Sequence, residues 1–216
     1  GGNWLIYIWA VTNGHVAAAS LGYFLNPLLN VLLGYLFLKE RLTRWQWAAV
    51  ALAGLGVTIL ATGALDALWI SLSLALSFGL YGLIRKVAPV GPMVGLASET
   101  IILLPLALGA LALWTVQGSG HFGALGVQTD LLLLAAGVVT AVPLLLFASA
   151  ARQMPYATIG LIQYIGPTIQ FLLAIFVYRE PLTTTHLVTF PLIWAGLLLY
   201  SWDMWRQSRS GLQAPA

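Results

Sequence analysis

The segment LGYFLNPLLNVLLGYLFLKERLT (21–43) recurs 140 residues later, without a gap, as LIQYIGPTIQFLLAIFVYREPLT (161–183). Apolar helices align with one another easily, so the case for a repeat depends on the rarer residues that coincide. These are Pro27 with Pro167, Lys39-Glu40 with Arg179-Glu180, and Leu42-Thr43 with Leu182-Thr183. A proline inside each apolar run and a basic-Glu pair at its end predict one helical hairpin that is present twice.

The composition places this hairpin in a membrane. Only 7% of the 216 residues are charged and 60% are apolar, whereas charged residues make up about a quarter of soluble domains. The charges also gather in clusters, separated by long uncharged runs such as 100–129, 131–151 and 153–178. A membrane-spanning helix needs about 20 apolar residues, so these runs predict an all-α integral membrane protein.

Turn residues divide the runs into helices. Asn13-Gly14 is a strong turn dipeptide, Thr43 with Gln46 fits a capping box, and the only sizeable loop expected covers 117–130. The first helix is short and begins without a cap, so we interpret it as truncated at its N-terminus. The expected helices are 1–12, 16–38, 44–63, 67–84, 93–115, 131–151, 155–178 and 186–205, followed by a polar tail.

Lysine and arginine predict the orientation, because they are enriched in cytoplasmic loops. Eight of the nine cations fall on one side of the expected helices and only Arg179 on the other. The C-terminal tail is therefore expected in the cytoplasm. Since the two basic-Glu pairs then lie on opposite faces, the repeats are inverted, as in many secondary transporters. The eight cations are Lys39, Arg41, Arg44, Arg85, Lys86, Arg152, Arg206 and Arg209.

The repeat also divides the chain. We expect 1–63 to be the remainder of a first repeat, 64–205 a second repeat of five helices, and 206–216 a cytoplasmic tail. The helices at 67–84 and 93–115 lack first-repeat partners, which the 140-residue shift would start about 70 residues before Gly1. A complete inverted-repeat bundle would then have ten helices, of which about seven to eight are present here.

Several stretches closely resemble RarD-type permeases of the EamA family, in the drug/metabolite transporter superfamily. They are GGNWLIYIWAVTNGH (1–15), ASLGYFLNPLLNVLLGYLFLKERL (19–42), LSFGLYGLIRK (76–86), IQYIGPTIQFLLAI (162–175) and FPLIW (190–194). The resemblance covers essentially the whole chain apart from 117–130. It implies a ten-helix, multi-pass permease of the bacterial inner membrane, of a group often named for chloramphenicol sensitivity. Against that pattern, the first two helices and part of the third are missing.

Glu99 is an acidic residue inside the helix expected at 93–115. A carboxylate within a membrane costs several kcal/mol unless it is paired, hydrated or protonated, and no basic residue lies within a helix turn of it. One interpretation is a functional acid that couples protons or contacts substrate. The other is a structural acid that bonds to a neighbouring helix or lies in interfacial water, and the sequence leaves both open.

Each copy of the repeat carries a proline beside amide and aromatic side chains. Proline breaks an i to i−4 bond, which in lipid is tolerated only where neighbours or a cavity satisfy the freed carbonyl. We therefore predict helix breaks at Pro27 and Pro167 beside a central cavity lined by both copies, with helix–helix hydrogen bonding as the alternative. The polar residues are Tyr23, Asn26 and Asn30 in one copy and Gln163, Tyr164 and Gln170 in the other.

Ser73, Ser77 and Tyr81 follow one another at four-residue intervals and so share one face of the helix at 67–84. Ser77 and Tyr81 complete the predicted substrate or proton pathway, although serines in membrane helices also serve close packing.

These features predict a proton-coupled secondary transporter of small organic solutes or drug-like compounds that works by alternating access. A non-transporting scaffold or partner subunit would not need prolines beside amides in both copies. An intramembrane enzyme would need clustered catalytic groups, which Glu99 alone does not supply.

The expected partners are the small-molecule substrate and the lipid bilayer, and a homodimer stays open. We expect no cofactor. No metal site is expected, because the three histidines share no ligand spacing and cysteine is absent. No nucleic-acid contact is expected, because the cations form no basic stripe.

Overall fold

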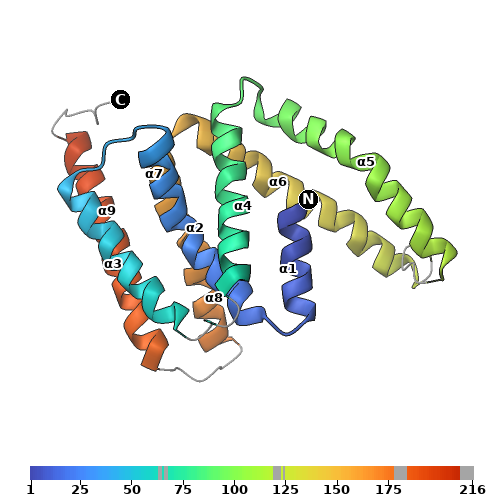
Figure 1. The fold of residues 1–216 in the computed structure, drawn as a ribbon, viewed down its shortest axis with the longest axis horizontal. Helices are drawn as coiled ribbons and strands as arrows, with labels where there is room; N and C mark the ends of the chain where they lie inside the picture. The colour runs from blue at the N-terminus through green and yellow to red at the C-terminus, as the bar shows by residue number, and fades with distance from the viewer. Residues whose placement is uncertain (63–64, 66–67, 119–122, 124, 178–183, 210–216) are drawn as a thin grey trace. The chain divides into compact units, whose positions relative to one another are not determined.

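The structure is a computed structural model that describes residues 1–62, 65, 68–118, 123, 125–177 and 184–209 (Figure 1). All regular secondary structure within these ranges is helical. Six of the described helices, α2 to α6 and α9, are long and apolar enough to cross a membrane, which confirms an all-α, multi-pass membrane protein. The helices are α1 (Gly2–Thr12), α2 (Val16–Phe37), α3 (Arg44–Ala61), α4 (Leu68–Val87), α5 (Pro92–Val116), α6 (Val127–Gln153), α7 (Tyr156–Ile162), α8 (Ile165–Phe176) and α9 (Thr184–Arg209).

The helices form two compact units. Unit 1 consists of Gly1–Leu83 and Met154–Ala216, and unit 2 of Ile84–Gln153. Unit 1 therefore contains both copies of the hairpin, and unit 2 contains the end of α4 with α5 and α6. This division follows contacts, whereas the boundary between two sequence repeats near residue 64 stays a prediction.

Local signals in the sequence determine several helix ends. Gly14 has a positive φ of 80° directly after α1, as the Asn13-Gly14 turn predicts. Thr43 accepts a hydrogen bond from the Gln46 backbone, and the Gln46 side chain accepts one from the Thr43 backbone. The predicted capping box at the start of α3 is therefore confirmed.

The loop between α5 and α6 is shorter than expected, because α6 begins at Val127 rather than at residue 131. Asp130 lies in the first turn of α6, where an acidic side chain interacts favourably with the helix dipole. Its carboxylate also accepts a hydrogen bond from the Gly123 N–H at 2.8 Å. Gln128, Thr129 and Asp130, which were expected in the loop, therefore belong to the first turn of the helix.

The helix expected at 155–178 is two helices, α7 and α8, which separate at Gln163-Tyr164. Pro167 lies in the first turn of α8 and has no N–H to donate to the Gln163 carbonyl. That carbonyl accepts a hydrogen bond from the Gly166 N–H instead, at 3.2 Å. The break therefore lies about one turn before Pro167.

The equivalent proline does not end its helix, contrary to expectation. α2 continues from Val16 to Phe37 with Pro27 inside it. Proline interrupts only one i to i−4 bond, and Pro27 is fully buried against α7. Packing on both halves of α2 therefore keeps it continuous.

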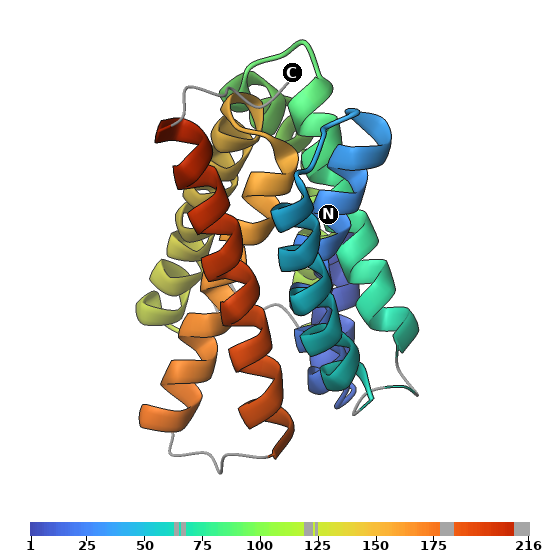
Figure 2. The same cartoon turned by 90° about the vertical axis from the view of Figure 1, so that its left-hand side faces the viewer.

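The two copies pack against each other in unit 1 through equivalent helices. α3 and α9 lie side by side (Figures 1 and 2) with reciprocal contacts: Gly56 lies against Thr189, and Gly196 lies against Ala49. Gly196 and Thr189 are the equivalents of Gly56 and Ala49, so the same contact occurs twice with the roles exchanged. This is a local two-fold relation. The pairing runs in opposite directions along the two helices, as inverted repeats require.

α2 packs in the same antiparallel way against its own equivalent, α7. A side-chain carbon at Gly160 would come within 2.6 Å of the Pro27 carbonyl, so this crossing is very close. The main apolar core lies where α2, α3, α7 and α9 meet, and it includes Phe24, Val57 and Ile193. Side chains from both copies therefore build one core.

A second apolar cluster joins α1 and α4 to another face of α2. Ala18 and Leu74 are buried in it, and Ser71 donates a hydrogen bond to the Ala18 carbonyl at 2.6 Å. Gly22 permits the close approach, because a Cβ there would lie 3.0 Å from the Cβ of Leu74. α4 therefore covers one face of α2.

Unit 2 is different in composition. α5 and α6 have the highest mean hydropathy of the membrane-length helices that the structure describes, 2.0 and 2.6, and they bury few side chains. Such surfaces suit contact with lipid or with other apolar helices.

Candidate substrate pathway

Asn30 and Gln163 are predicted pathway residues that the structure joins across the repeats. The Asn30 amide nitrogen donates a hydrogen bond to Gln163 Oε1 at 2.8 Å, and Gln163 lies at the break between α7 and α8. Asn30 is completely buried. The side-chain amides of Asn30 and Gln163, one from each copy, therefore contact each other at the crossing of α2 and α7.

Two buried acceptors on α2 have no hydrogen-bond donor among the described residues. They are Asn26 Oδ1 and Asn30 Oδ1, on side chains that are 6% and 0% exposed. Leaving a buried acceptor unsatisfied costs about 1–3 kcal/mol. The two residues are one helix turn apart and share a face, so they offer two acceptors to a ligand with N–H or O–H groups.

A small cavity lies beside Asn26, where α1 and α4 pack on α2. It measures about 10 Å³, roughly the space of one water molecule. Asn3, Tyr23 and Phe78 contribute to its lining, and Asn3 donates a hydrogen bond to Ser77 Oγ at 2.8 Å. Tyr23 and Asn26 therefore line the same small cavity, and Ser77 is linked to it through its hydrogen bond with Asn3.

Tyr164 and Tyr81, two further predicted residues of unit 1, do not line this cavity. Tyr164 is fully buried in the main core, and its hydroxyl donates to the Phe24 carbonyl at 3.2 Å. Tyr81 lies on α4, with its ring centroid 6.2 Å from that of Phe78. Gln170 belongs to α8, but its side chain lies outside the described residues.

Glu40 joins the end of α2 to the start of α7. Its carboxylate accepts hydrogen bonds from the backbone N–H groups of Tyr156 at 2.6 Å and Ala157 at 2.9 Å. These N–H groups have no partner within α7, and the positive end of the helix dipole favours a carboxylate. Lys39 adopts a left-handed φ of 56° directly before Glu40. Gly34 leaves room, because a Cβ there would lie 2.7 Å from Glu40 Oε2.

Asp203 is a second acidic residue that joins distant helix ends. It is 0% exposed and accepts hydrogen bonds from Thr43 Oγ1 at 2.7 Å and from Gln207 Nε2 at 2.6 Å. Thr43 is the N-cap of α3. Asp203 therefore connects the start of α3 with the end of α9, the equivalent helix of the other copy.

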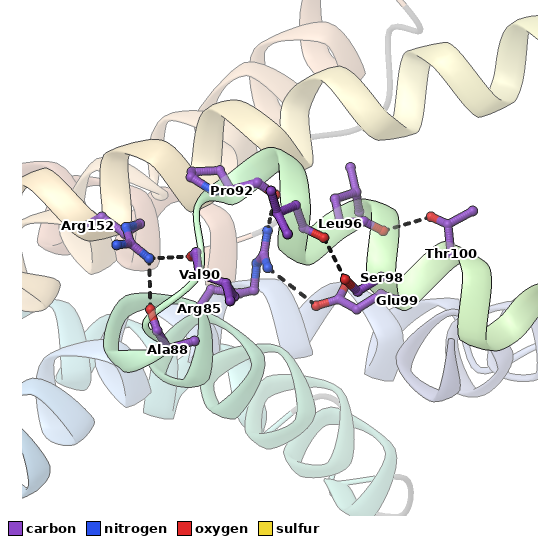
Figure 3. A network of polar contacts seen from close by, with 10 residues as sticks. Arg85, Ala88, Val90, Pro92, Leu96, Ser98, Glu99, Thr100 and Arg152 are labelled. Atoms are coloured by element: carbon purple, nitrogen blue, oxygen red, sulfur yellow. Dashed lines mark hydrogen bonds and ion pairs between the residues drawn. The ribbon is translucent and has the colours of Figure 1, made fainter.

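Glu99 has an ion-pair partner in unit 2. Its carboxylate lies 3.7 Å from the Arg85 guanidinium, which also donates to the Pro92 carbonyl (Figure 3). The turn between α4 and α5 brings the two charges together. Gly95 makes room for them, because a Cβ there would overlap the guanidinium. The Glu99 side chain stays 41% exposed, so it is paired and accessible at once.

Two more cations hold the same turn. Arg152 donates hydrogen bonds to the carbonyls of Ala88 and Val90 (Figure 3), and Lys86 donates to the Ala151 carbonyl at 2.9 Å. The α4–α5 turn is therefore fastened to the end of α6. Within the described ranges, His, Asp and Glu side chains form no group of three or more that could hold a metal ion.

Comparison with known proteins identifies the family. The model of the EamA-like transporter family matches residues 1–62. An uncharacterized transporter of Pseudomonas aeruginosa is 50% identical over 209 residues, which is 96% of this chain and 70% of that protein. The chain belongs to the EamA family.

Within the EamA family the similarity extends to RarD proteins. The protein RarD of Streptomyces exfoliatus is 46% identical over 99% of this chain and 69% of its own length. A chloramphenicol-sensitive protein RarD of Pseudomonas aeruginosa is 36% identical over 97% of this chain and 71% of its own length. No solved structure matches the chain. The chain is therefore a RarD-type EamA protein, and the transporter names of its relatives support a permease-type function.

Sequence reasoning missed three partners in this EamA protein. Arg85 lies 14 residues before Glu99, too far for a pattern within one helix turn to pair them. The bond of Glu40 to α7 spans 116 residues, which no local pattern reveals. Asp203 did leave a signal, because an acid near the C-terminal end of a helix opposes the helix dipole and so needs specific donors.

Proposed function

We propose that this EamA chain belongs to a secondary transporter that moves small organic solutes or drug-like compounds across the bacterial inner membrane. Its C-terminus lies in the cytoplasm, as the distribution of cations favours, and proton exchange drives the cycle. One relative has chloramphenicol in its name, which supports a drug-like substrate.

The observation that carries the proposal is the reciprocal, antiparallel packing of the two repeat copies. α2 meets α7 and α3 meets α9 around a local two-fold relation. Two inverted halves can exchange conformations, and the exchange opens a central site first to one face of the membrane and then to the other. This is the alternating-access mechanism.

The proposed substrate site runs along α2, from the cavity beside Asn26 to the hydrogen bond between Asn30 and Gln163 at the crossing of α2 and α7. The unsatisfied acceptors of Asn26 and Asn30 favour a substrate with N–H or O–H donors. Such groups would replace the hydrogen bonds that the two buried oxygens lack. The other members of the proposed pathway are Tyr23, Ser77, Tyr81, Gln163, Tyr164 and Gln170, with Glu99 as the proton-coupling acid.

The variant Asn26→Leu tests the substrate site. Its uptake of radiolabelled chloramphenicol is compared with that of the wild type, with both full-length proteins in proteoliposomes. Leucine has nearly the shape of asparagine but no polar atom, so the thermal unfolding temperature should stay the same or rise. Uptake should fall by about tenfold or more, the equivalent of ~1.4 kcal/mol of lost binding. Thr58→Val removes an exposed hydroxyl on α3 and should change neither quantity. Wild-type uptake by Asn26→Leu would exclude Asn26 from the site.

The same vesicles test proton coupling under imposed pH gradients. Glu99→Gln should transport without acceleration by the gradient, because it removes the one carboxyl group among the residues of the proposed pathway. Asp130→Asn changes another acidic side chain of unit 2 and should keep the acceleration. If Glu99→Gln retains an unchanged pH dependence, Glu99 is a structural partner of Arg85 and not the coupling acid.

A further inference from the structure

One end of unit 1 brings cationic and aromatic side chains of α3 and α9 together. Thr43, directly before α3, donates a hydrogen bond to Asp203 near the end of α9 at 2.7 Å, so the residues beside these two lie close to one another (Figure 1). The rings of Trp45 and Trp202 accordingly meet edge to face, with their centroids 5.6 Å apart. The basic–aromatic surface at this end consists of Arg44, Trp45, Trp202, Trp205, Arg206 and Arg209.

All six side chains of the basic–aromatic surface are exposed. Trp45, Trp202 and Trp205 are 46%, 43% and 55% exposed. The guanidinium carbon of Arg206 lies 5.3 Å from the centroid of the Trp202 ring, and that of Arg209 lies 4.2 Å from the centroid of the Trp205 ring. A cation over an aromatic face is attracted to it, and each arginine follows its tryptophan by one helix turn. Each pair therefore places a positive charge beside an exposed apolar ring.

The surface is positive because the acidic side chains at this end are engaged elsewhere. Asp203 is the only acidic residue in α3 and α9. It is 0% exposed and lies 3.9 Å from Arg206. Glu40, in the loop before α3, is bonded to α7. The opposite end of the same helix pair has no lysine or arginine among its described residues, 58–62 and 184–188. The described positive charge of this helix pair is therefore confined to one end.

The basic–aromatic surface also lies at the ends of two candidate membrane spans. These spans are Arg44–Ala61 in α3 and Thr184–Gln207 in α9. Tryptophan and arginine at the end of a span sit at the level of the lipid headgroups. Phosphate is the negative group at that level, and a guanidinium binds it through two parallel hydrogen bonds. The surface thus combines charges that suit phosphate with rings that suit an acyl chain.

We propose that the basic–aromatic surface binds an anionic phospholipid of the phosphatidylglycerol type. Arg206 and Arg209 hold its phosphate, and an acyl chain packs against Trp45 and Trp202. The excess of positive charge favours a headgroup that is anionic overall. This inference concerns lipid binding, and it depends on neither the substrate, nor proton coupling, nor the face of the membrane on which the C-terminus lies.

A belt of tryptophan and arginine can also anchor a membrane protein without selecting a lipid. The two cases differ in what they require of the arginines. A belt depends on the number of charges near the headgroups, whereas a binding site depends on where the charges lie and on the planar, two-pronged shape of the guanidinium. Variants that change position or shape at constant charge therefore distinguish them.

Native mass spectrometry of the full-length protein tests the proposal, with phosphatidylglycerol or phosphatidylcholine titrated into delipidated protein in detergent. The wild type should retain phosphatidylglycerol at a lipid concentration about tenfold lower than phosphatidylcholine. Arg206→Gln/Arg209→Gln should lose this preference. Arg206→Lys/Arg209→Lys keeps both charges but not the bidentate geometry, so it should weaken phosphatidylglycerol binding by about threefold or more.

Lys39→Gln/Arg41→Gln is the matched control. Both side chains are exposed in the loop directly before α3. The control therefore removes as many charges as Arg206→Gln/Arg209→Gln, at the same end of unit 1 but outside the basic–aromatic surface. Its affinity for phosphatidylglycerol should stay within about twofold of the wild type at physiological salt, where exposed charges are screened over about 8 Å.

Three results would overturn the proposal. The first is equal retention of the two lipids by the wild type. The second is unchanged binding by Arg206→Gln/Arg209→Gln, or an equal loss in Lys39→Gln/Arg41→Gln, which would show a diffuse belt. The third is thermal stabilisation of the wild type by inorganic phosphate and not by phosphatidylglycerol, which would make a soluble phosphate the ligand. If the glutamine variant of the two arginines does not fold, the lysine variant decides, because it keeps a cation beside Asp203.

Discussion

α2 and the α7–α8 pair occupy equivalent positions in the repeat, yet one is a single helix of 22 residues and the other is split into helices of 7 and 12. Both contain a proline at the same position. α2 has α4 along one face and Gly160 against Pro27, whereas Ile162 and Leu173, at the corresponding positions of α7 and α8, are 47% and 45% exposed among the described residues. The comparison teaches that a proline permits a break, and that the packing around it decides whether the helix breaks.

Gly160→Ala should have the largest effect on this comparison. The new Cβ would lie 2.6 Å from the Pro27 carbonyl and 3.0 Å from the Asn30 Cβ, so α2 and α7 would have to separate. Overpacking of this kind costs about 1–3 kcal/mol, and the thermal unfolding temperature in detergent should fall by several degrees. Gly166→Ala on α8 meets nothing within 4 Å and should not lower it. Equal behaviour of the two variants would show that the crossing tolerates more volume than the distances indicate.

Thr43→Ala should have the next largest effect, because it cuts the tie between α3 and its equivalent α9. It removes the N-cap of α3, worth about 0.5–2 kcal/mol, and takes one donor from the buried Asp203 carboxylate. The expected result is a lower unfolding temperature. Thr43→Ser keeps both bonds and should be close to wild type. A similar loss in Thr43→Ser would assign the effect to the lost methyl group instead.

Pro167→Ala should change stability least, by about 1 kcal/mol or less, but it sharpens the comparison most directly. Alanine restores an N–H that can bond to the Gln163 carbonyl, so amides near the break should exchange with deuterium more slowly in mass spectrometry. Pro27→Ala should leave exchange in α2 nearly unchanged, because α2 is already continuous. Faster exchange around Gln163 in Pro167→Ala would show that proline stabilises the break rather than causes it.

The sequence predicted the ends of the helices better than the contacts between helices. Gly14 and Thr43 act on residues close to them in sequence. The end of α1 and the start of α3 could therefore be predicted from the sequence. Asn26 and Asn30 are buried, as the cost of exposing amides to lipid requires. The continuity of α2 at Pro27 could not be read, because it depends on residues more than 100 positions away.

The same limit applies to the polar ties. Glu40 meets Tyr156 across 116 residues and Thr43 meets Asp203 across 160. Each hydrogen bond forms only when the two copies are packed together. The spacing of residues within one helix therefore cannot predict it. Glu99 and Arg85 are closer in sequence, but they lie on different helices, and the turn between α4 and α5 brings them together.

The reciprocal contact of Gly56 and Gly196 limits how far the two copies can diverge. Each glycine faces the backbone of the other copy, at 3.0 Å from the Thr189 carbonyl oxygen and 2.7 Å from the Ala49 carbonyl oxygen for an added Cβ. A larger residue at either position would need a compensating change in the opposite half of the gene. Substitutions at Gly56 and Gly196 are therefore constrained by the other copy. The two glycines can remain matched after most other similarity between the copies has been lost.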